Sequence, residues 1–328
     1  MKNCRFLVTG GTGFIGSALV RRLHGLGHYV RILDSGLRSS VNRISDIIDD
    51  IDFYAEDIRD SGAVLEAIQG VDCVIHLAAL NGTDFFYKKP SLVLDIGVRG
   101  MLNVIEGCQK QGVGNLVVAS SSEVYQTPSK IPTDETIALD IPDILNPRYS
   151  YGGSKLISEL LAINYGRSDF DRVTIFRPHN VYGPDMGMGH VIPQFILRAL
   201  ESLDKHSVGP VPFPIQGDGT QTRSFVHIDD MIDALMLVIN KGKHLNIYHI
   251  GNPEEITIAS VAEKLFEYLE RDVHLETSPL PQGSTKRRCP NIDKIRELGF
   301  SPRIFFQEGL HSVVDWYISN RESSYQKN

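Results

Sequence analysis

The chain has 328 residues, of which 42% are hydrophobic and 22% charged, an ordinary composition for a globular protein of about two domains. Its formal net charge of −7 argues against a nucleic-acid partner, because such proteins need a basic face. No apolar run approaches the roughly 20 residues that span a bilayer, and the N-terminus enters a predicted strand at once. We therefore expect no signal peptide, no membrane association and a cytoplasmic location. The scattered cysteines indicate reduced thiols, not a metal site or disulfides.

The first predicted strand, residues 6–9, runs into a glycine-rich turn and then a helix that ends near residue 26. Glycines in such a turn let a pyrophosphate approach the N-terminus of the helix, where backbone amides and the helix dipole favour an anion. A purely structural turn is the alternative. The pattern predicts a dinucleotide site, with these cofactor-binding residues: Gly10, Gly13, Phe14, Ile15 and Gly16.

The second predicted strand, residues 29–33, ends in Asp34. An acidic residue about 20 positions after the glycine turn accepts hydrogen bonds from the adenosine ribose of NAD, and its charge would repel the 2′-phosphate of NADP. We therefore expect NAD as the cofactor, although Arg38 follows closely and would suit a phosphate. A turn or capping aspartate is the alternative reading of Asp34.

Further strands alternate with helices along the first half of the chain. They are predicted at 53–55, 73–79, 116–119 and 173–176, with a long helix at 91–111. This alternation predicts an α/β fold with a doubly wound parallel Rossmann sheet. Five more residues at strand ends are expected to line the cofactor site: Asp57, Ile58, Leu77, Ala78 and Ala79. His76, inside an apolar run, is expected to be a core residue.

Tyr151 and Lys155 are four residues apart in a predicted helix, so they lie on one face, one turn from each other. A nearby ammonium favours a phenolate, so we expect the pKa of Tyr151 to fall from about 10 toward neutrality. Alone, this spacing is common on helix surfaces. Its weight comes from the glycine turn, from Asp34 and from the serines that follow the fifth predicted strand.

Together these motifs resemble the extended short-chain dehydrogenase/reductase family, in the branch of nucleotide-sugar epimerases, dehydratases and decarboxylases. The resemblance covers nearly the whole chain. It implies that Ser121 bonds the C4 hydroxyl of the sugar, that Tyr151 is the base and that Lys155 binds the cofactor ribose. It also implies a set of residues that bind the diphosphate of the substrate: Asn180, Arg223, and Arg287 or Arg288. A solvated basic patch is the alternative reading of the last two.

The resemblance implies oxidation of the sugar at C4 as the first step. Dehydratases of this branch carry an Asp-Glu pair after the catalytic Ser or Thr, whereas this chain has Ser122 and Glu123. We therefore favour a C4 epimerase, which needs no further group. The first alternative is a UDP-glucuronate-type decarboxylase, since decarboxylases show Ser-Glu there, and a 4,6-dehydratase comes last. Glu123 is a candidate catalytic residue; otherwise it orders the loop.

The resemblance also implies two domains and a homodimer formed through helices 91–111 and 149–166. Residues 1–179 are expected to form the NAD-binding Rossmann domain, with helix 229–240 packing back on it. Residues 180–328 are expected to form a smaller α/β domain that binds the nucleotide sugar. Two departures from the family pattern stand out. Arg99 replaces an asparagine of the long helix, and segment 81–87, with Asp84, is unfamiliar and is expected to face the sugar.

Overall fold

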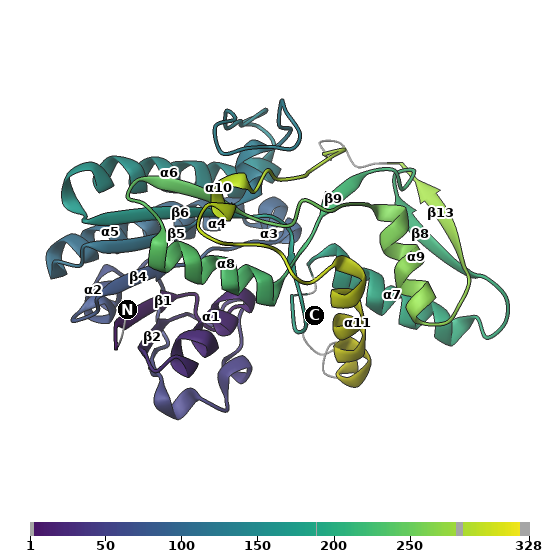
Figure 1. Cartoon of the computed structure of the whole chain (residues 1–328), viewed down its shortest axis with the longest axis horizontal. Helices are drawn as coiled ribbons and strands as arrows, with labels where there is room; N and C mark the ends of the chain where they lie inside the picture. Colours follow the sequence, from purple (N-terminus) through teal and green to yellow (C-terminus); the bar gives the residue numbers. More distant parts are fainter. Residues whose placement is uncertain (1–2, 188, 280–284, 322–328) are drawn as a thin grey trace.

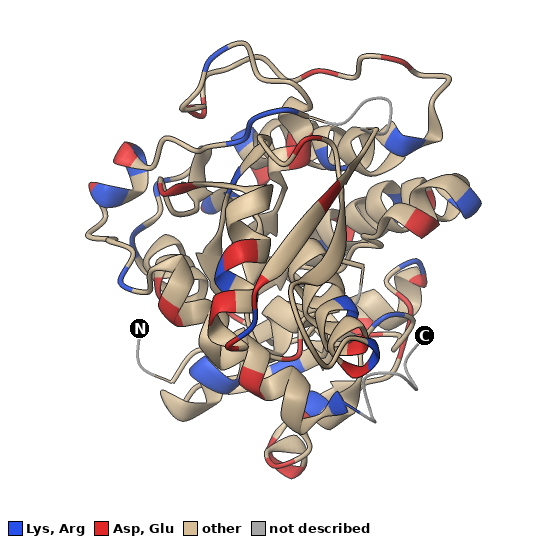
Figure 2. Ribbon diagram, turned by 90° about the vertical axis from the view of Figure 1, so that its right-hand side faces the viewer, with Lys and Arg blue, Asp and Glu red and all other residues tan. Residues whose placement is uncertain are grey.

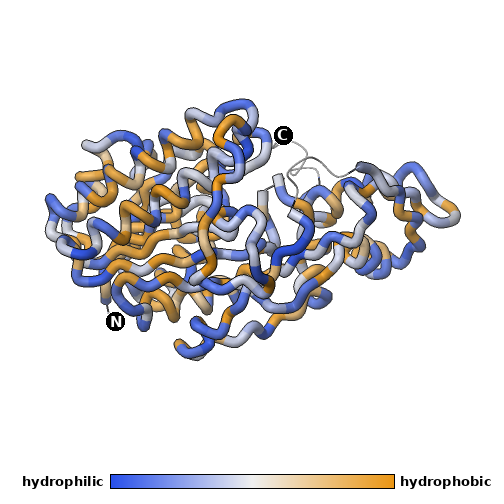
Figure 3. The backbone as a smooth tube through the Cα atoms, turned by 90° about the horizontal axis from the view of Figure 1, so that it is seen from above, coloured by the Kyte–Doolittle hydropathy of each residue, from blue (hydrophilic) through white to orange (hydrophobic). Residues whose placement is uncertain are grey.

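Two lobes of unequal size make up the molecule (Figure 1). The computed structural model describes residues 3–187, 189–279 and 285–321. The larger lobe contains the central sheet and its flanking helices, and the smaller lobe is built from segments that follow residue 180. Figure 3 shows hydrophobic residues concentrated along the strands and inner helix faces of the larger lobe.

Within the described residues, seven strands form one parallel sheet in the order β11–β6–β5–β4–β1–β2–β3. Their sequences are short apolar runs because helices cover both faces of the sheet. The predicted doubly wound parallel sheet is therefore confirmed. The strands are β1 (Arg5–Thr9), β2 (Tyr29–Leu33), β3 (Asp52–Tyr54), β4 (Cys73–His76), β5 (Asn115–Ala119), β6 (Arg172–Pro178) and β11 (Asn246–Ile250).

Each face of the sheet has its own hydrophobic core. One core packs α1 (Phe14–Gly25) and α8 (Ile228–Lys241) against the strands, with the short helix α10 (Asp293–Arg296) at its edge. The other core packs α2 (Ser61–Ile68), α5 (Gly100–Gln111) and α6 (Ser150–Asp169). Helix α8 contacts α1 and the sheet of the larger lobe.

The larger lobe also includes a strand from beyond residue 180. Strand β11 pairs in parallel with β6, with Ile247 opposite Ile175. The domain boundary at residue 179 stays a prediction. One edge strand of the central sheet, β11, nevertheless comes from the part of the chain that follows this boundary. Segments of the two lobes therefore alternate along the chain, which places loops of both around the same edge of the sheet.

The smaller lobe has a core of its own. Its largest strand pair is β8 (Val211–Gln216) with β13 (Val273–Ser278), covered by α7 (Val191–Lys205), α9 (Ile258–Tyr268) and α11 (Phe306–Ser319). Short pairs join the lobes: β7 (Val181–Tyr182) with β10 (Val226–His227), and β9 (Thr222–Ser224) with β12 (Glu255–Thr257). Figure 2 looks onto this lobe, where basic and acidic residues are interspersed.

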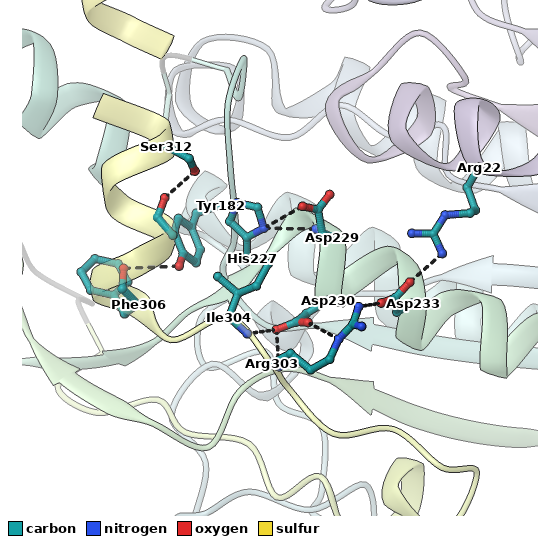
Figure 4. Close-up of polar contacts among 11 residues, drawn as sticks. Arg22, Tyr182, His227, Asp229, Asp230, Asp233, Arg303, Ile304, Phe306 and Ser312 are labelled. Carbon is teal, nitrogen blue, oxygen red and sulfur yellow. Dashed lines mark hydrogen bonds and ion pairs between the residues drawn. The ribbon is translucent and has the colours of Figure 1, made fainter. Parts of the chain in front are cut away.

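A polar junction ties α11 to the larger lobe (Figure 4). The Asp230 carboxylate, on α8 and 1% exposed, accepts hydrogen bonds from the backbone amides of Arg303 and Ile304, each 2.9 Å long. Asp233, one turn later, forms ion pairs with Arg303 and with Arg22 of α1. These contacts fix the segment that leads into α11.

The helix predicted at 91–111 is continuous but changes its hydrogen bonding. It comprises α4 (Pro90–Leu94), a π-helical turn (Asp95–Arg99) and α5. The turn brings Gly97 against α6, where an added Cβ would lie 2.7 Å from the Cβ of Ser154, and Ser158 donates to the Gly97 carbonyl over 3.2 Å. Arg99 instead points outward and pairs with Asp95. The replacement of the family asparagine by Arg99 stays a prediction, and Gly97 is the residue of this turn that faces α6.

Candidate active site

Most of the residues that the sequence indicated line one cleft at the carboxyl ends of the sheet strands. The cleft encloses about 430 Å³ and is lined by both lobes. Ligands of doubly wound sheets bind in this position. The predicted residues that line it are Gly10, Gly13, Phe14, Ile15, Gly16, Asp34, Asp57, Ile58, Leu77, Ala78, Ala79, Ser121, Glu123, Tyr151, Lys155 and Asn180.

The glycine turn leaves room for a pyrophosphate. Gly10 has φ +72°, and a Cβ there would lie 3.0 Å from the backbone of Ala78. A Cβ on Gly16 would lie 2.1 Å from the Gly10 carbonyl oxygen, so a side chain is excluded. Gly13 caps α1 without a side chain, and the first turn of α1 has no acidic residue. These observations fit an anion at the helix N-terminus, as a bound dinucleotide requires.

Asp34 is held at the edge of this turn. One carboxylate oxygen accepts from the Thr12 amide (3.0 Å) and hydroxyl (2.7 Å), and the other accepts from the Gly36 amide and the Ser39 hydroxyl. Arg38 points away from it, with its guanidinium 5.5 Å from the centroid of the Phe85 ring. The carboxylate therefore lies beside the cofactor cleft without a guanidinium next to it, which fits NAD better than NADP.

Tyr151 and Lys155 project from the first turns of α6, and both are buried. The Lys155 ammonium donates to the Ala119 carbonyl at the end of β5 over 2.7 Å. The Tyr151 ring stacks on Phe86, with centroids 5.4 Å apart. Ser121 follows β5 and accepts a hydrogen bond from the Glu123 amide. The cleft thus contains a serine hydroxyl, a phenol and an ammonium side by side.

Burial controls the ionisation of this group. It raises the pKa of Tyr151 to about 12, although the hydrogen bond with Ser121 favours the phenolate. It lowers the pKa of Lys155 to about 8. Our expectation of a tyrosine pKa near neutrality is therefore wrong for the chain by itself. The ammonium is directed to the Ala119 carbonyl and lies 5.9 Å from the tyrosine ring centroid, so desolvation dominates.

An ion pair between half-buried Glu123 and buried Arg288 adjoins Ser121. Arg288 donates to both oxygens of Glu123, and the contact from Nη2 measures 3.1 Å. Burial opposes the charge of Glu123, but Arg288, with Arg148 and Arg223, outweighs it and lowers the pKa of this carboxyl group. Burial and Arg288 in turn lower the pKa of Arg223 to about 10. Glu123 is therefore a carboxylate among guanidinium groups at neutral pH.

The predicted substrate-binding residues differ in burial and in hydrogen-bond partners. The Asn180 side chain donates to the Ser224 carbonyl over 2.8 Å, next to Arg223 on β9. Arg288 is buried beside Glu123, whereas Arg287 is half-exposed and pairs with Glu255 on the outside. Of the two adjacent arginines, the structure thus directs Arg288 inward.

The structure also places the histidines and the unfamiliar segment 81–87. His76 is buried and bonds the Thr9 hydroxyl over 2.8 Å, as expected for a core histidine. Asp84 is exposed and pairs with Lys88, one turn along α3 (Thr83–Lys88). The unfamiliar segment lines the cleft through Asn81, Gly82, Thr83 and Phe86. His190 also lines the cavity, and burial lowers its pKa to about 4.

Sequence reasoning missed two contributors, Phe86 and Arg148. Arg148 lines the cleft from a 3₁₀ turn (Pro147–Tyr149) directly before α6. Its position one turn before Tyr151 could have pointed to it. No pattern close to Phe86 in the sequence indicates its place in the cleft, because its stacking partner, Tyr151, is remote in the chain.

The sequence agrees with one known family. The family model for the NAD dependent epimerase/dehydratase family matches residues 6–251. The chain belongs to this family. Its cofactor is NAD, and its wider group is the nucleotide-sugar branch of the extended short-chain dehydrogenases/reductases.

Relatives in this family catalyse different reactions. UDP-glucuronic acid decarboxylase 1 of Arabidopsis thaliana is 31% identical over 95% of this chain and 69% of its own. The solved dTDP-glucose 4,6-dehydratase DesIV of Streptomyces venezuelae, with NAD bound, has a TM-score of 0.88 and 31% identity, covering 99% of this chain and 100% of its own. UDP-glucose 4-epimerase of Thermotoga maritima has a TM-score of 0.85 and 26% identity, covering 97% and 99%.

The described residues contain neither a metal-binding group nor a membrane-spanning helix. In residues 3–187, 189–279 and 285–321, no three His, Cys, Asp or Glu side chains gather as a metal-binding group. Within the same ranges, the helices are too short or too polar to cross a bilayer.

Proposed function

We propose that the protein oxidises the C4 hydroxyl of a nucleotide-linked hexuronate and then releases its carboxyl group as carbon dioxide. The observation that carries this proposal is the pair between half-buried Glu123 and buried Arg288, two residues from Ser121. Family membership and the grouping of Ser121, Tyr151 and Lys155 support the oxidation step. The decarboxylase relative supports the second step.

In the first step, Ser121 and Tyr151 hold the C4 oxygen of the sugar, and Tyr151 accepts its proton. The phenol is protonated in the chain alone, because burial keeps its pKa at about 12. The Ser121 hydrogen bond and the Lys155 ammonium one turn away both favour the phenolate form. Bound NAD would supply the acceptor for the hydride that leaves C4 and, as NADH, the donor for its return.

In the second step, the 4-keto sugar acid is a β-keto acid. The bond between C5 and C6 breaks, its electron pair forms an enolate with the negative charge on the C4 oxygen, and carbon dioxide leaves. The hydroxyls of Ser121 and Tyr151 then stabilise that oxygen. A proton added at C5 restores the ketone, which is reduced at C4. No acid has to protonate a leaving group in this sequence.

Dehydration is less well supported, because it needs an acid for the departing C6 hydroxyl. Ser122 stands where such an acid is expected, and Glu123 is an ionised partner of Arg288. Epimerisation at C4, which the sequence alone favoured, remains the second candidate, because the Thermotoga maritima epimerase matches nearly the whole chain. We rank it below decarboxylation because the decarboxylase relative is 31% identical to this chain, whereas the epimerase is 26% identical.

The test is incubation of the purified protein with UDP-, GDP- and dTDP-sugars, neutral and uronic, followed by mass spectrometry. Decarboxylation predicts that only uronates react and that each product has lost one carbon dioxide. A new isomer of unchanged mass would establish epimerisation, and loss of one water would establish dehydration; either result refutes the proposal.

We further propose that the protein is a homodimer through α6 and the helix beside it. Leu160 is 56% exposed, and Ile157, Tyr165 and Leu94 extend the same apolar surface. Helices α4 and α6 are in contact, so these side chains lie on neighbouring helices. A large apolar strip on packed helices is typical of a contact with a second copy.

A further inference from the structure

Arg148 is a cleft residue to which nothing above assigns a task. It lies in the 3₁₀ turn (Pro147–Tyr149), one turn before Tyr151, and its backbone amide donates to the Asn146 side chain over 3.0 Å. The side chain lines the cleft. Its Nε atom is buried and has no hydrogen-bond partner among the described residues. A buried guanidinium nitrogen without an acceptor is costly, so this one is expected to find its acceptor in a ligand.

The charges around Arg148 point to an anionic ligand. Three guanidinium groups, those of Arg148, Arg223 and Arg288, act on one carboxylate, that of Glu123. Arg288 already occupies both oxygens of Glu123, and Arg223 donates to the Thr222 carbonyl. In the described part of the chain, Arg148 forms no ion pair with an acidic side chain. The cluster therefore carries excess positive charge in a partly dry cleft, where an anion is attracted most strongly.

A nucleotide hexuronate has two anionic groups that could bind Arg148, the diphosphate at C1 and the carboxylate at C6. Arg223 and Arg288 come from segments after residue 180, on the side where the diphosphate is expected. Arg148 instead precedes the catalytic turn of α6, and its charge acts on Glu123, two residues after Ser121. Ser121 and Tyr151 hold C4 in the proposed function, and C6 is two bonds from C4.

We propose that the Arg148 guanidinium binds the C6 carboxylate and selects nucleotide hexuronates over the corresponding neutral sugars. This inference rests on the proposed function. Arginine suits the role because its planar fork matches both oxygens of a carboxylate. Arg148 is thus a specificity-determining residue, distinct from Arg288, whose fork is engaged with Glu123.

The chemistry sets which kinetic constant depends on Arg148. The negative charge leaves the carboxylate as carbon dioxide forms and moves toward the C4 oxygen. An interaction with the carboxylate therefore stabilises the bound substrate at least as much as the transition state, so its loss raises KM and leaves kcat nearly unchanged.

The experiment uses the NAD-loaded protein and three probes: UDP, UDP-glucose and UDP-glucuronate. Their dissociation constants are measured by calorimetry for the wild type, Arg148→Gln, Arg148→Lys and the control Arg167→Gln. Arg167 is exposed near the far end of α6. We expect Arg148→Gln to weaken UDP-glucuronate by about 30-fold or more, the loss typical of a buried charge pair with one partner removed. UDP and UDP-glucose should bind within about twofold of wild type, since no carboxylate is involved.

Kinetics on UDP-glucuronate should show the same rise in KM with kcat within about threefold. Arg148→Lys keeps the positive charge without the planar fork, so its affinity for UDP-glucuronate should lie between those of the wild type and Arg148→Gln. It also replaces Arg148→Gln in the test if that variant loses its NAD on purification. Equal weakening of all three probes would assign Arg148 to the diphosphate and overturn the inference. So would unchanged binding of UDP-glucuronate, or a fall in kcat at constant KM. If the wild type releases no carbon dioxide from any uronate, the proposed function fails instead.

Discussion

The Lys155 ammonium should destabilise the fold that carries it. Burial holds its pKa at about 8, against an ordinary value of 10.5. At about 1.4 kcal/mol for each pKa unit, burying the charged amine costs about 3 kcal/mol. Replacing Lys155 by Met removes the charge, keeps a long apolar side chain, and loses the hydrogen bond to the Ala119 carbonyl, worth about 1 kcal/mol. Lys155→Met should therefore be about 2 kcal/mol more stable than wild type at pH 7, with turnover abolished.

The pH dependence follows from the sign of the shift. Below about pH 8 the amine is charged in both the folded and the unfolded chain, so the wild type bears the full cost. Between about pH 8 and 10.5 the folded chain releases its proton first, so the unfolded chain binds more protons and wild-type stability rises with pH. The advantage of Lys155→Met should shrink over this window and vanish near its upper end.

The assay is urea unfolding followed by circular dichroism, at pH 7 and pH 10, on protein freed of nucleotide so that binding adds no stability. Lys88→Met is the matched control, because Lys88 is an exposed residue of a surface ion pair with Asp84. It should show little difference from wild type at either pH. A Lys155→Met protein that is less stable than wild type at pH 7, or whose advantage is the same at both pH values, would refute the reasoning.

Four other changes test separate parts of the molecule. Tyr151→Phe should abolish turnover while NAD stays bound, and unchanged turnover would rule out its role as base. Asp34→Ser should raise the affinity for NADP relative to NAD by about tenfold, measured by calorimetry, since the repelling carboxylate is gone. Leu160→Glu should turn a dimer into a monomer in ultracentrifugation; a wild type that is already monomeric contradicts the proposed interface. Asp230→Ala should lower stability by about 2–4 kcal/mol in urea unfolding, because two buried backbone amides lose a charged acceptor.

Local sequence features predicted most of the larger lobe. The apolar runs marked the strands, and the glycine turn and Asp34 marked the cofactor edge, because each depends on residues close together in the chain. The place of strand β11 beside β6 was not predicted, since the pairing joins segments about seventy positions apart and no local pattern encodes the partner. The order of strands therefore required the structure.

The sugar side of the cleft shows the same limit more sharply. Sequence could name Glu123 and two adjacent arginines, but the Glu123–Arg288 contact spans 165 positions. Side chains of neighbouring residues in an extended segment point to opposite sides, so Arg287 and Arg288 cannot both face inward. The backbone bridge between Thr222 and Arg287 holds this segment in place, with Arg288 on the side of Glu123. The pKa of Tyr151 was mispredicted for a related reason. Helical spacing reports the distance to Lys155, whereas burial depends on everything packed around the phenol.

The π-helical turn shows how a glycine inside a long helix can act through packing. Because Gly97 has no side chain, α6 can lie close against it, and the altered turn exposes the Gly97 carbonyl to the Ser158 hydroxyl. Ser154, the residue that Gly97 admits, directly precedes Lys155. The close approach therefore sets how far α6 extends toward β5, where the Lys155 ammonium meets the Ala119 carbonyl. The Gly97 contact thus lies one residue away from Lys155, in the helical turn that carries the ammonium.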